Sequence, residues 1–274
     1  MPTVTGPSFD IEYEVHGTDE RGTVLLICGT GQPAVMWSML GTITGLTDLG
    51  YRVVTFDNRG IAGAPCPTPP WTVRDMGDDA LAVLEDVGPA YVAGASLGAL
   101  ITQDVSLRRP DLVRGVIFIV GGGGFSPSFR HALNGLVALY EQGLEPPKAL
   151  EDFTMLQAML TPDQRADPAM VDLALSMSAA LTETFGPGGQ HGQYAADATW
   201  ANEDHLTELA GMQVPVLVIA NEHDPIFPTR GLQDVAKTVP DATYVEVPGV
   251  SHVAIDPASN DIVHAAIRDF LAAH

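Results

Sequence analysis

Basic side chains are scarce in this sequence of 274 residues. Lysine and arginine together number 13, against 34 aspartates and glutamates, and the formal net charge is −21. Lys148 and Lys237 are the two lysines. A surface this negative repels phosphate backbones and anionic lipid headgroups. The composition therefore argues against binding to nucleic acid or to a membrane surface, and it leaves the oligomeric state open.

Cysteines and long apolar runs are also few. Cys28 and Cys66 are the two cysteines, too few for a disulfide framework, and we expect both thiols to be reduced. The first residues lack the basic and apolar segments of a signal peptide. The longest apolar run, residues 113–120, is too short to span a bilayer. These absences predict a cytoplasmic protein.

Short apolar or β-branched runs alternate with helix-like segments along most of the chain. Strands are predicted at residues 11–15, 24–27, 52–56, 91–93, 113–120, 216–219 and 243–247. Helices are predicted at residues 36–49, 72–87 with Thr72 as the N-cap, 97–109 and 260–273. This alternation predicts an α/β fold with a mostly parallel sheet and helices on both faces.

The alternation stops between about residues 125 and 211. Helix follows helix there, at residues 129–140, 148–160, 168–185 and 194–209, with proline and glycine between them. We therefore predict a core domain of residues 1–124 and 212–274. A helical cap, residues 125–211, would be inserted into it.

A candidate nucleophile follows the strand at residues 91–93. Gly94-Ala95-Ser96-Leu97-Gly98 joins a predicted strand to a predicted helix. A serine on such a tight turn projects its hydroxyl away from the backbone, and flanking glycines avoid clashes. The pattern Gly-x-Ser-x-Gly is weakly specific alone and strong in this context. The alternative is a serine N-cap between two packing glycines.

Serine is a poor nucleophile without a base and an orienting carboxylate. His252 follows a predicted strand and precedes the last helix, where it could reach Ser96 at the carboxyl edge of the sheet. Asp224 follows the strand at residues 216–219 and is our candidate acid, with Glu222 as the fallback. His252 as an ordinary loop histidine is the competing interpretation.

Two backbone N–H groups are candidates for an oxyanion hole. Leu97 opens a helix directly after Ser96, and Thr30 lies in the glycine-containing loop after the strand at residues 24–27. A glycine-rich turn without a special role is the alternative for that loop. The loop lacks the Lys-Ser/Thr ending of a phosphate loop.

Neither His-Glu-x-x-His nor zinc-spaced cysteines and histidines occur, so we expect no metal and no cofactor.

Together these segments resemble the α/β-hydrolase superfamily, especially its esterase, cofactor-free haloperoxidase and polyketide methylesterase branch. Asp57-Asn58-Arg59-Gly60 resembles that family's Asp-x-Arg-Gly loop. Asp224-Pro225-Ile226-Phe227-Pro228 resembles the segment that carries its acid, and Gly249-Val250-Ser251-His252 resembles the segment that carries its histidine. Cys28-Gly29 departs from the frequent His-Gly, and residues 61–64 depart from the usual continuation of the Arg-Gly loop. The resemblance implies an α/β-hydrolase fold and a Ser96–His252–Asp224 triad.

The resulting hypothesis is a serine hydrolase. It would cleave an ester, thioester or lactone of a mainly apolar small molecule through an acyl-enzyme. Candidate substrate contacts are Gly29, Gly121, Gly122, Met155, Met159 and Trp200. For the cap side chains, simple packing onto the sheet is the competing interpretation.

One alternative function is a natural-product tailoring enzyme that uses the same triad for elimination, cyclisation or acyl transfer. A catalytically silent binding protein on this fold is another.

Overall fold

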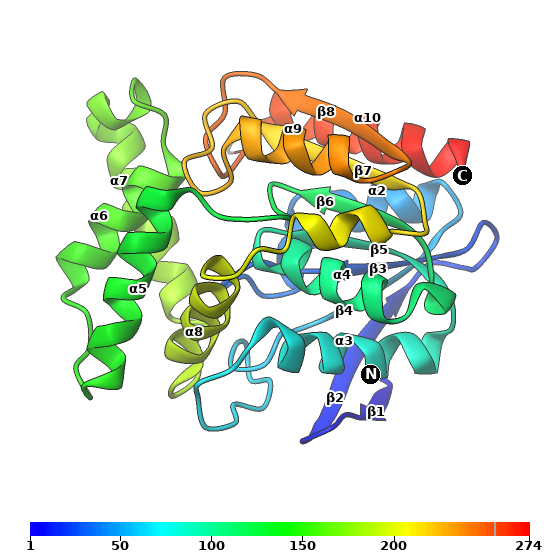
Figure 1. Ribbon diagram of the computed structural model, residues 1–274, viewed down its shortest axis with the longest axis horizontal. Coiled ribbons are helices and arrows are strands. Elements are labelled where there is room, and N and C mark those ends of the chain that lie inside the picture. Colours follow the sequence, from blue (N-terminus) through cyan, green and yellow to red (C-terminus); the bar gives the residue numbers. More distant parts are fainter. Residues whose placement is uncertain (255) are drawn as a thin grey trace.

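A computed structural model of the chain describes residues 1–254 and 256–274. It contains a sheet in the order β1-β2-β4-β3-β5-β6-β7-β8 (Figure 1). The pairs β1–β2 and β2–β4 are antiparallel, and every pair from β4 to β8 is parallel. The strands are β1 (Thr3–Thr5), β2 (Asp10–His16), β3 (Thr23–Ile27), β4 (Arg52–Phe56), β5 (Ala90–Ala95), β6 (Val113–Ile119), β7 (Val216–Asn221) and β8 (Ala242–Val247).

Helices cover both faces of this sheet. One face carries α3 (Val73–Val87), α4 (Leu97–Arg108) and α9 (Thr229–Thr238). The other carries α1 (Val35–Met39), α2 (Thr42–Asp48) and α10 (Pro257–Ala273). Short 3-10 helices are η1 (Pro110–Leu112), η2 (Gln164–Ala166) and η3 (Thr207–Gly211). The predicted α/β-hydrolase fold, with a mostly parallel sheet between helical layers, is confirmed.

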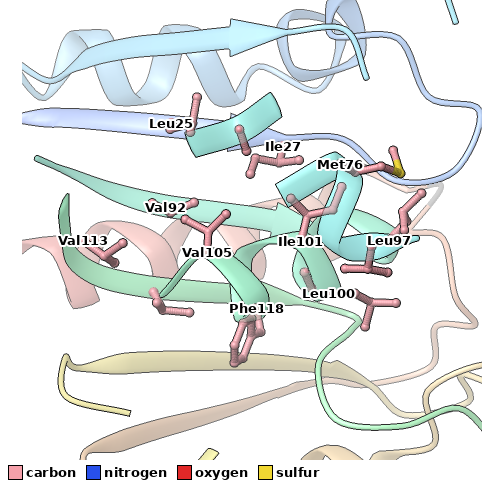
Figure 2. Close-up of a cluster of buried hydrophobic side chains, with 14 of the residues drawn as sticks. Leu25, Ile27, Met76, Val92, Leu97, Leu100, Ile101, Val105, Val113 and Phe118 are labelled. Carbon is pink, nitrogen blue, oxygen red and sulfur yellow. The ribbon is translucent and has the colours of Figure 1, made fainter. Parts of the chain in front are cut away.

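The alternation of side chains along β3 divides the core into two layers. Leu25 and Ile27 pack with the cluster on the α3 and α4 face, whereas Val24 and Leu26 pack with the α2 and α10 face. Figure 2 shows the first layer, where β3 and β5 side chains meet those of α3 and α4. Because both faces are covered, the strand has no polar alternation, as expected of a buried parallel strand.

Some predicted elements differ from those observed. The helix predicted at residues 36–49 is two helices, because Gly41 adopts a left-handed φ of +76° and interrupts it. The segment predicted at residues 194–209 also splits, into α8 (Gly189–Ala201) and η3. The edge strand β1 and the helix α9 were not predicted. Thr72 does cap α3, where its side chain and that of Asp75 form a capping box.

Between β6 and β7 the described chain forms four α-helices in succession. These inserted helices are α5 (Pro127–Glu141), α6 (Lys148–Met159), α7 (Pro168–Thr182) and α8. They gather beyond one end of the sheet (Figure 1). The division of the chain into a core and a cap at residues 124 and 212 stays a prediction. Across residues 1–254 and 256–274, every helix is too short or too polar to cross a lipid bilayer.

A buried ion pair holds the loop after β4 against α3. The Arg59 guanidinium donates to both carboxylate oxygens of Asp79, at 2.7 and 2.8 Å, and to the Asp75 carbonyl at 2.9 Å. Arg59 and Asp79 are 5% and 3% exposed. The Asp-x-Arg-Gly loop therefore has a structural anchor in the interior.

The substitution Asp79→Ala is expected to lower the free energy of unfolding by about 3–5 kcal/mol, because it leaves a buried guanidinium without its carboxylate. Chemical denaturation followed by circular dichroism measures this loss. Glu85→Ala is the matched control, since it removes a partner of the more exposed Arg109 from the same helix. Equal losses in the two variants would contradict a structural role for the buried pair.

Candidate active site

Ser96 stands on a strained turn between β5 and α4. Its φ of +53° and ψ of −119° lie in a region that residues with a Cβ rarely adopt. Its backbone N–H donates to the Ile119 carbonyl of β6 at 3.0 Å, which fixes the turn against the neighbouring strand. Strain of this kind persists where the surroundings enforce it, and it is frequent at functional sites.

Two glycines make this turn sterically feasible. A Cβ on Gly94 would lie 2.0 Å from the carbonyl oxygen of Gly98, and a Cβ on Gly98 would lie 2.2 Å from that of Ile27. Both separations are far shorter than a real contact, so any other residue would push α4 away from β3 and β5. The Gly-x-Ser-x-Gly pattern is thus a packing requirement of the turn that presents Ser96.

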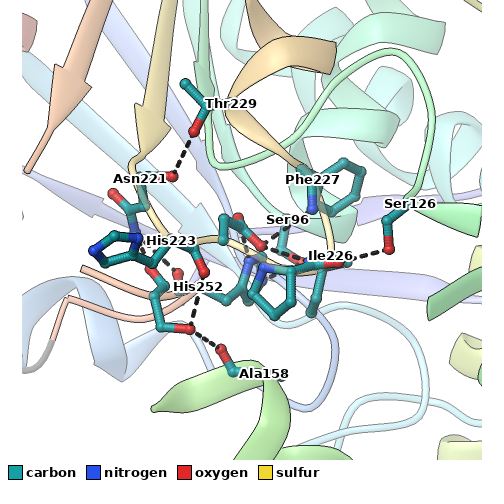
Figure 3. Close-up of polar contacts among 12 residues, drawn as sticks. Ser96, Ser126, Ala158, Asn221, His223, Ile226, Phe227, Thr229 and His252 are labelled. Atoms are coloured by element: carbon teal, nitrogen blue, oxygen red, sulfur yellow. Dashed lines mark hydrogen bonds and ion pairs between the residues drawn. The ribbon is translucent and has the colours of Figure 1, made fainter. Parts of the chain in front are cut away.

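The predicted serine, histidine and aspartate form one hydrogen-bonded chain (Figure 3). His252 Nε2 lies 3.0 Å from Ser96 Oγ, and His252 Nδ1 lies 2.8 Å from Asp224 Oδ2. Ser96 follows β5, His252 follows β8 and Asp224 follows β7. They meet because parallel strands place their carboxyl ends at one edge of the sheet. A serine, an imidazole and a carboxylate in this order are the parts of a nucleophile activated by a base.

The backbone around His252 is held from two sides. The Asn221 side chain at the end of β7 donates to the carbonyls of Ser251 (2.7 Å) and His252 (3.2 Å). From the inserted helix α6, the Ala158 carbonyl accepts from the His252 N–H (3.1 Å) and the Ser251 hydroxyl (2.7 Å). The position of the imidazole therefore depends on the inserted helices as well as on the sheet.

Asp224, and not the fallback Glu222, contacts the imidazole. Asp224 is 5% exposed, and its Oδ1 accepts from the N–H groups of Ile226 (2.8 Å) and Phe227 (3.1 Å). These bonds leave Oδ2 for His252 Nδ1. Glu222 is exposed, and its carboxylate accepts from the Gly249 N–H at 2.8 Å.

The two predicted oxyanion donors lie beside Ser96. Leu97 is the first residue of α4, and Thr30 lies in the loop after β3 that borders the serine turn. Neither N–H donates a hydrogen bond to another residue within the described chain. Helix α8 holds the Thr30 loop, because the Gly31 N–H donates to Gln193 Oε1 at 2.8 Å.

Ser96 and His252 open onto a cavity between the sheet edge and the inserted helices. Its empty volume is about 1240 Å³, including its opening to solvent. The exposed surface of this cavity is mainly apolar. Its apolar residues come from α1, from α5 to α7 and their loops, and from the loops after β7 and β8: Met36, Phe125, Phe129, Leu133, Leu136, Met155, Ala158, Met159, Met177, Leu181, Phe185, Ile226 and Val253. An apolar cavity with a few polar groups is typical of a small-molecule site.

The predicted substrate contacts divide into two groups. Met155 and Met159 line the cavity. Gly29, Gly121, Gly122 and Trp200 lie outside its lining, and contact between these four residues and a substrate stays a prediction.

These four residues have packing roles. Cβ atoms on Gly29 and Gly121 would lie 3.1 Å from Ser96 Cβ and 2.8 Å from the Ser96 carbonyl oxygen, and one on Gly122 would lie 3.2 Å from Phe118. The glycines therefore let backbone approach the serine turn and β6. The Trp200 indole donates to the Gly123 carbonyl at 2.9 Å and stacks on His205.

Sequence reasoning missed the polar side chains of the cavity. Asp197 of α8 accepts a hydrogen bond from Thr30 Oγ1 at 2.7 Å. Near the start of the same helix, Gln190 Nε2 donates to Glu151 Oε1 (2.9 Å) and to the Tyr194 hydroxyl (3.2 Å). Burial raises the pKa of the Tyr194 hydroxyl to about 12. A single carboxylate among the alanines of Ala195-Ala196-Asp197-Ala198 was the available signal.

Neither cysteine belongs to this site. Cys28 and Cys66 are free thiols, and Cys28 is buried in the layer that contains α2. Burial raises the pKa of the Cys28 thiol, which keeps it protonated as a packing residue. Within residues 1–254 and 256–274, the carboxylates, histidines and cysteines do not gather in threes that could hold a metal ion.

A family model described as "Alpha/beta hydrolase family" matches residues 24–266, a span that includes the serine turn, the acid and the histidine. The chain belongs to the alpha/beta hydrolase family. Its sheet, helices and hydrogen-bonded serine fit the esterase and haloperoxidase-like branch of that family.

Similar proteins agree with this assignment. The chain is 26% identical over 263 residues to a protein of Mycobacterium tuberculosis named as a non-heme bromoperoxidase, BpoC, covering 95% of this chain and 97% of that protein. It is 24% identical over 273 residues to 3-oxoadipate enol-lactonase 2 of Acinetobacter baylyi, covering 98% and 97%. The crystal structure of BpoC from strain H37Rv superimposes with a TM-score of 0.83 at 24% identity, covering 96% of each chain. These relatives support an alpha/beta hydrolase enzyme.

Proposed function

We propose that this alpha/beta hydrolase cleaves an ester, thioester or lactone bond of a mainly apolar small molecule through an acyl-enzyme. The observation that carries the proposal is the chain of hydrogen bonds from Ser96 through His252 to Asp224, opening onto an apolar cavity. Similarity to an enol-lactonase supports a carbonyl substrate with an oxygen leaving group.

In the first step His252 acts as the general base. Its Nε2 accepts the proton of the Ser96 hydroxyl at 3.0 Å while Oγ attacks the carbonyl carbon. The carbonyl oxygen becomes an oxyanion, which the N–H groups of Leu97 and Thr30 stabilise. One such donor is worth roughly 3–4 kcal/mol of barrier. The protonated imidazole then gives its proton to the leaving oxygen or sulfur, and an acyl-Ser96 ester remains.

In the second step water replaces the leaving group. His252 removes a proton from the water, which attacks the acyl-Ser96 carbonyl, and the returning proton restores the serine hydroxyl. Asp224 keeps Nδ1 protonated and stabilises the imidazolium that forms in each half-reaction. Because Asp224 is buried and already bonded by two backbone N–H groups, its geometry is set before substrate binds.

The proposal predicts turnover of simple activated esters. With p-nitrophenyl acetate and butyrate, p-nitrophenol release should show a burst approaching one equivalent per chain, followed by slower steady hydrolysis. Stopped-flow absorbance measures both phases, and His252→Ala provides the background rate. Butyrate should be cleaved faster than acetate, because the cavity is apolar. Release no faster than the His252→Ala background would contradict the proposal and favour a non-hydrolytic use of the same residues.

A further inference from the structure

Asp197 is a buried carboxyl group in a cavity whose exposed surface is mainly apolar, although Lys148, Glu151 and Asp152 of α6 also line it. It lines the cavity from α8 and is 6% exposed. The side chains of α5 and α7 that line the same cavity include Phe129, Leu133 and Leu181. A carboxyl group in such surroundings costs free energy unless each oxygen has a partner.

Only one of the two Asp197 oxygens has a hydrogen-bond partner in the described chain. Oδ2 accepts from Thr30 Oγ1 at 2.7 Å. Oδ1 receives no hydrogen bond from residues 1–254 or 256–274, although the carboxyl group lines the cavity. Because Oδ1 is not among the buried atoms that lack a partner, it is open to the cavity, where a substrate group can donate to it.

Asp197 lies close to the position of the reacting carbonyl. Its partner Thr30 is a proposed oxyanion donor, and a Cβ on the preceding Gly29 would lie 3.1 Å from Ser96 Cβ. Asp197, Ser96 and His252 also line the same cavity. A donor that meets Oδ1 must therefore lie near the scissile bond, and not at the distant end of the substrate.

We propose that Asp197 is a specificity-determining residue that hydrogen-bonds a substrate hydroxyl one or two carbons from the scissile carbonyl. This inference rests on the proposed hydrolase function and deepens it. The substrate class becomes esters or lactones of hydroxy acids, with an apolar remainder that fills the space between α5, α6 and α7.

A hydroxyl fits this position better than an ammonium group. Burial raises the pKa of Asp197 to about 7, against the lowering effects of the Thr30 hydroxyl and His252. Both protonation states are then populated near neutral pH. A hydroxyl can donate to the carboxylate or accept from the carboxylic acid, whereas an ammonium group can only donate. A buried ammonium would also lose its hydration, a penalty that a neutral hydroxyl largely avoids.

The test compares ethyl esters that differ in one substituent. The series is ethyl butanoate, ethyl 2-hydroxybutanoate, ethyl 3-hydroxybutanoate and their methoxy counterparts, with ethyl 2-aminobutanoate as the ammonium probe. Acid release, followed with a pH indicator, gives kcat/KM for each. The methoxy esters keep the inductive effect of oxygen but cannot donate a hydrogen bond. The wild type is expected to prefer one hydroxy ester over its methoxy counterpart by about tenfold or more, as for hydrogen bonds to charged groups.

Substitutions of Asp197 test whether this residue causes the preference for the hydroxy ester. In Asp197→Ala the ratio of kcat/KM for the hydroxy ester to kcat/KM for its methoxy counterpart should fall to about one. Asp197→Asn keeps an acceptor oxygen, so part of the preference for the hydroxy ester should remain. Asp172→Asn, an equal charge change at an exposed position of α7 outside the cavity lining, should leave the ratio unchanged. Thermal unfolding confirms that each variant is folded.

Three results would overturn the assignment of Asp197: a wild type that does not distinguish hydroxy from methoxy esters, a preference that survives in Asp197→Ala, or a preference for the amino ester over the hydroxy esters. Hydrolysis of ethyl butanoate by the wild type, and its loss in Ser96→Ala, reports on the proposed function independently of these ratios. Failure of the specificity proposal is therefore distinguishable from failure of the hydrolase proposal.

Discussion

Replacing Ser96 with alanine is expected to lower kcat for ester hydrolysis by about 10⁵-fold or more, as for removal of a serine nucleophile elsewhere. The loss is this large because His252 Nε2, 3.0 Å from Oγ, has no other protein hydroxyl to activate within the described chain. What remains is substrate binding and the proposed oxyanion donors, the N–H groups of Thr30 and Leu97. KM should change little, since the substitution removes one oxygen from a cavity whose exposed surface is mainly apolar.

Ser38→Ala is the matched control for this variant. Ser38 is an exposed serine on α1, and its removal should leave both kcat and KM within experimental error of the wild type. Initial rates with p-nitrophenyl butyrate measure both variants. A Ser96→Ala protein that retains more than about one hundredth of the wild-type kcat would contradict the role of Ser96 as nucleophile.

Replacing Asp224 with asparagine is expected to lower kcat by about ten-thousandfold. Oδ1 of Asp224 accepts from the N–H groups of Ile226 and Phe227. The asparagine oxygen would take that position, so its NH₂ group would face His252 Nδ1. The imidazole would then place its lone pair on Nδ1 and its proton on Nε2, where it could no longer accept the proton of Ser96.

Glu222→Gln tests the specificity of this effect. Glu222 lies two residues away and carries the same charge, but it bonds the Gly249 N–H and not the imidazole. The rate of Glu222→Gln should stay within about threefold of the wild type, in the range expected for an exposed polar contact. Comparable losses in the two variants would show that the acid has been assigned incorrectly.

Most of the sheet and the serine–histidine–aspartate chain could be predicted because short stretches of neighbouring residues determine them. Buried strands such as β3 read as unbroken apolar runs, and the glycines of the serine turn mark where α4 packs against β3. His252 and Asp224 were recognisable because each follows a strand, and parallel strands bring their carboxyl ends together. The break of the predicted helix at Gly41 was less visible, because glycine inside a helical pattern is often tolerated.

The cavity could not be predicted in the same way, because its walls come from helices whose mutual arrangement no local pattern encodes. Asp197 meets Thr30 across 167 positions of sequence. Trp200 and Met159 looked equivalent in sequence, yet Trp200 packs on His205 while Met159 lines the cavity. Which face of an inserted helix points at the substrate depends on packing among the helices, and an apolar face predicts only burial.

Covalent labelling of Ser96 by a fluorophosphonate tests the central claim most directly, since that claim is that His252 makes the Ser96 oxygen nucleophilic. Labelling rates are measured by intact-protein mass, and the modified residue is identified by peptide mass spectrometry. The account predicts one adduct, on Ser96, with a rate at least about 100-fold lower in His252→Ala, where the serine remains but the base is gone. An adduct on another residue, or equal labelling rates in the wild type and His252→Ala, would contradict it.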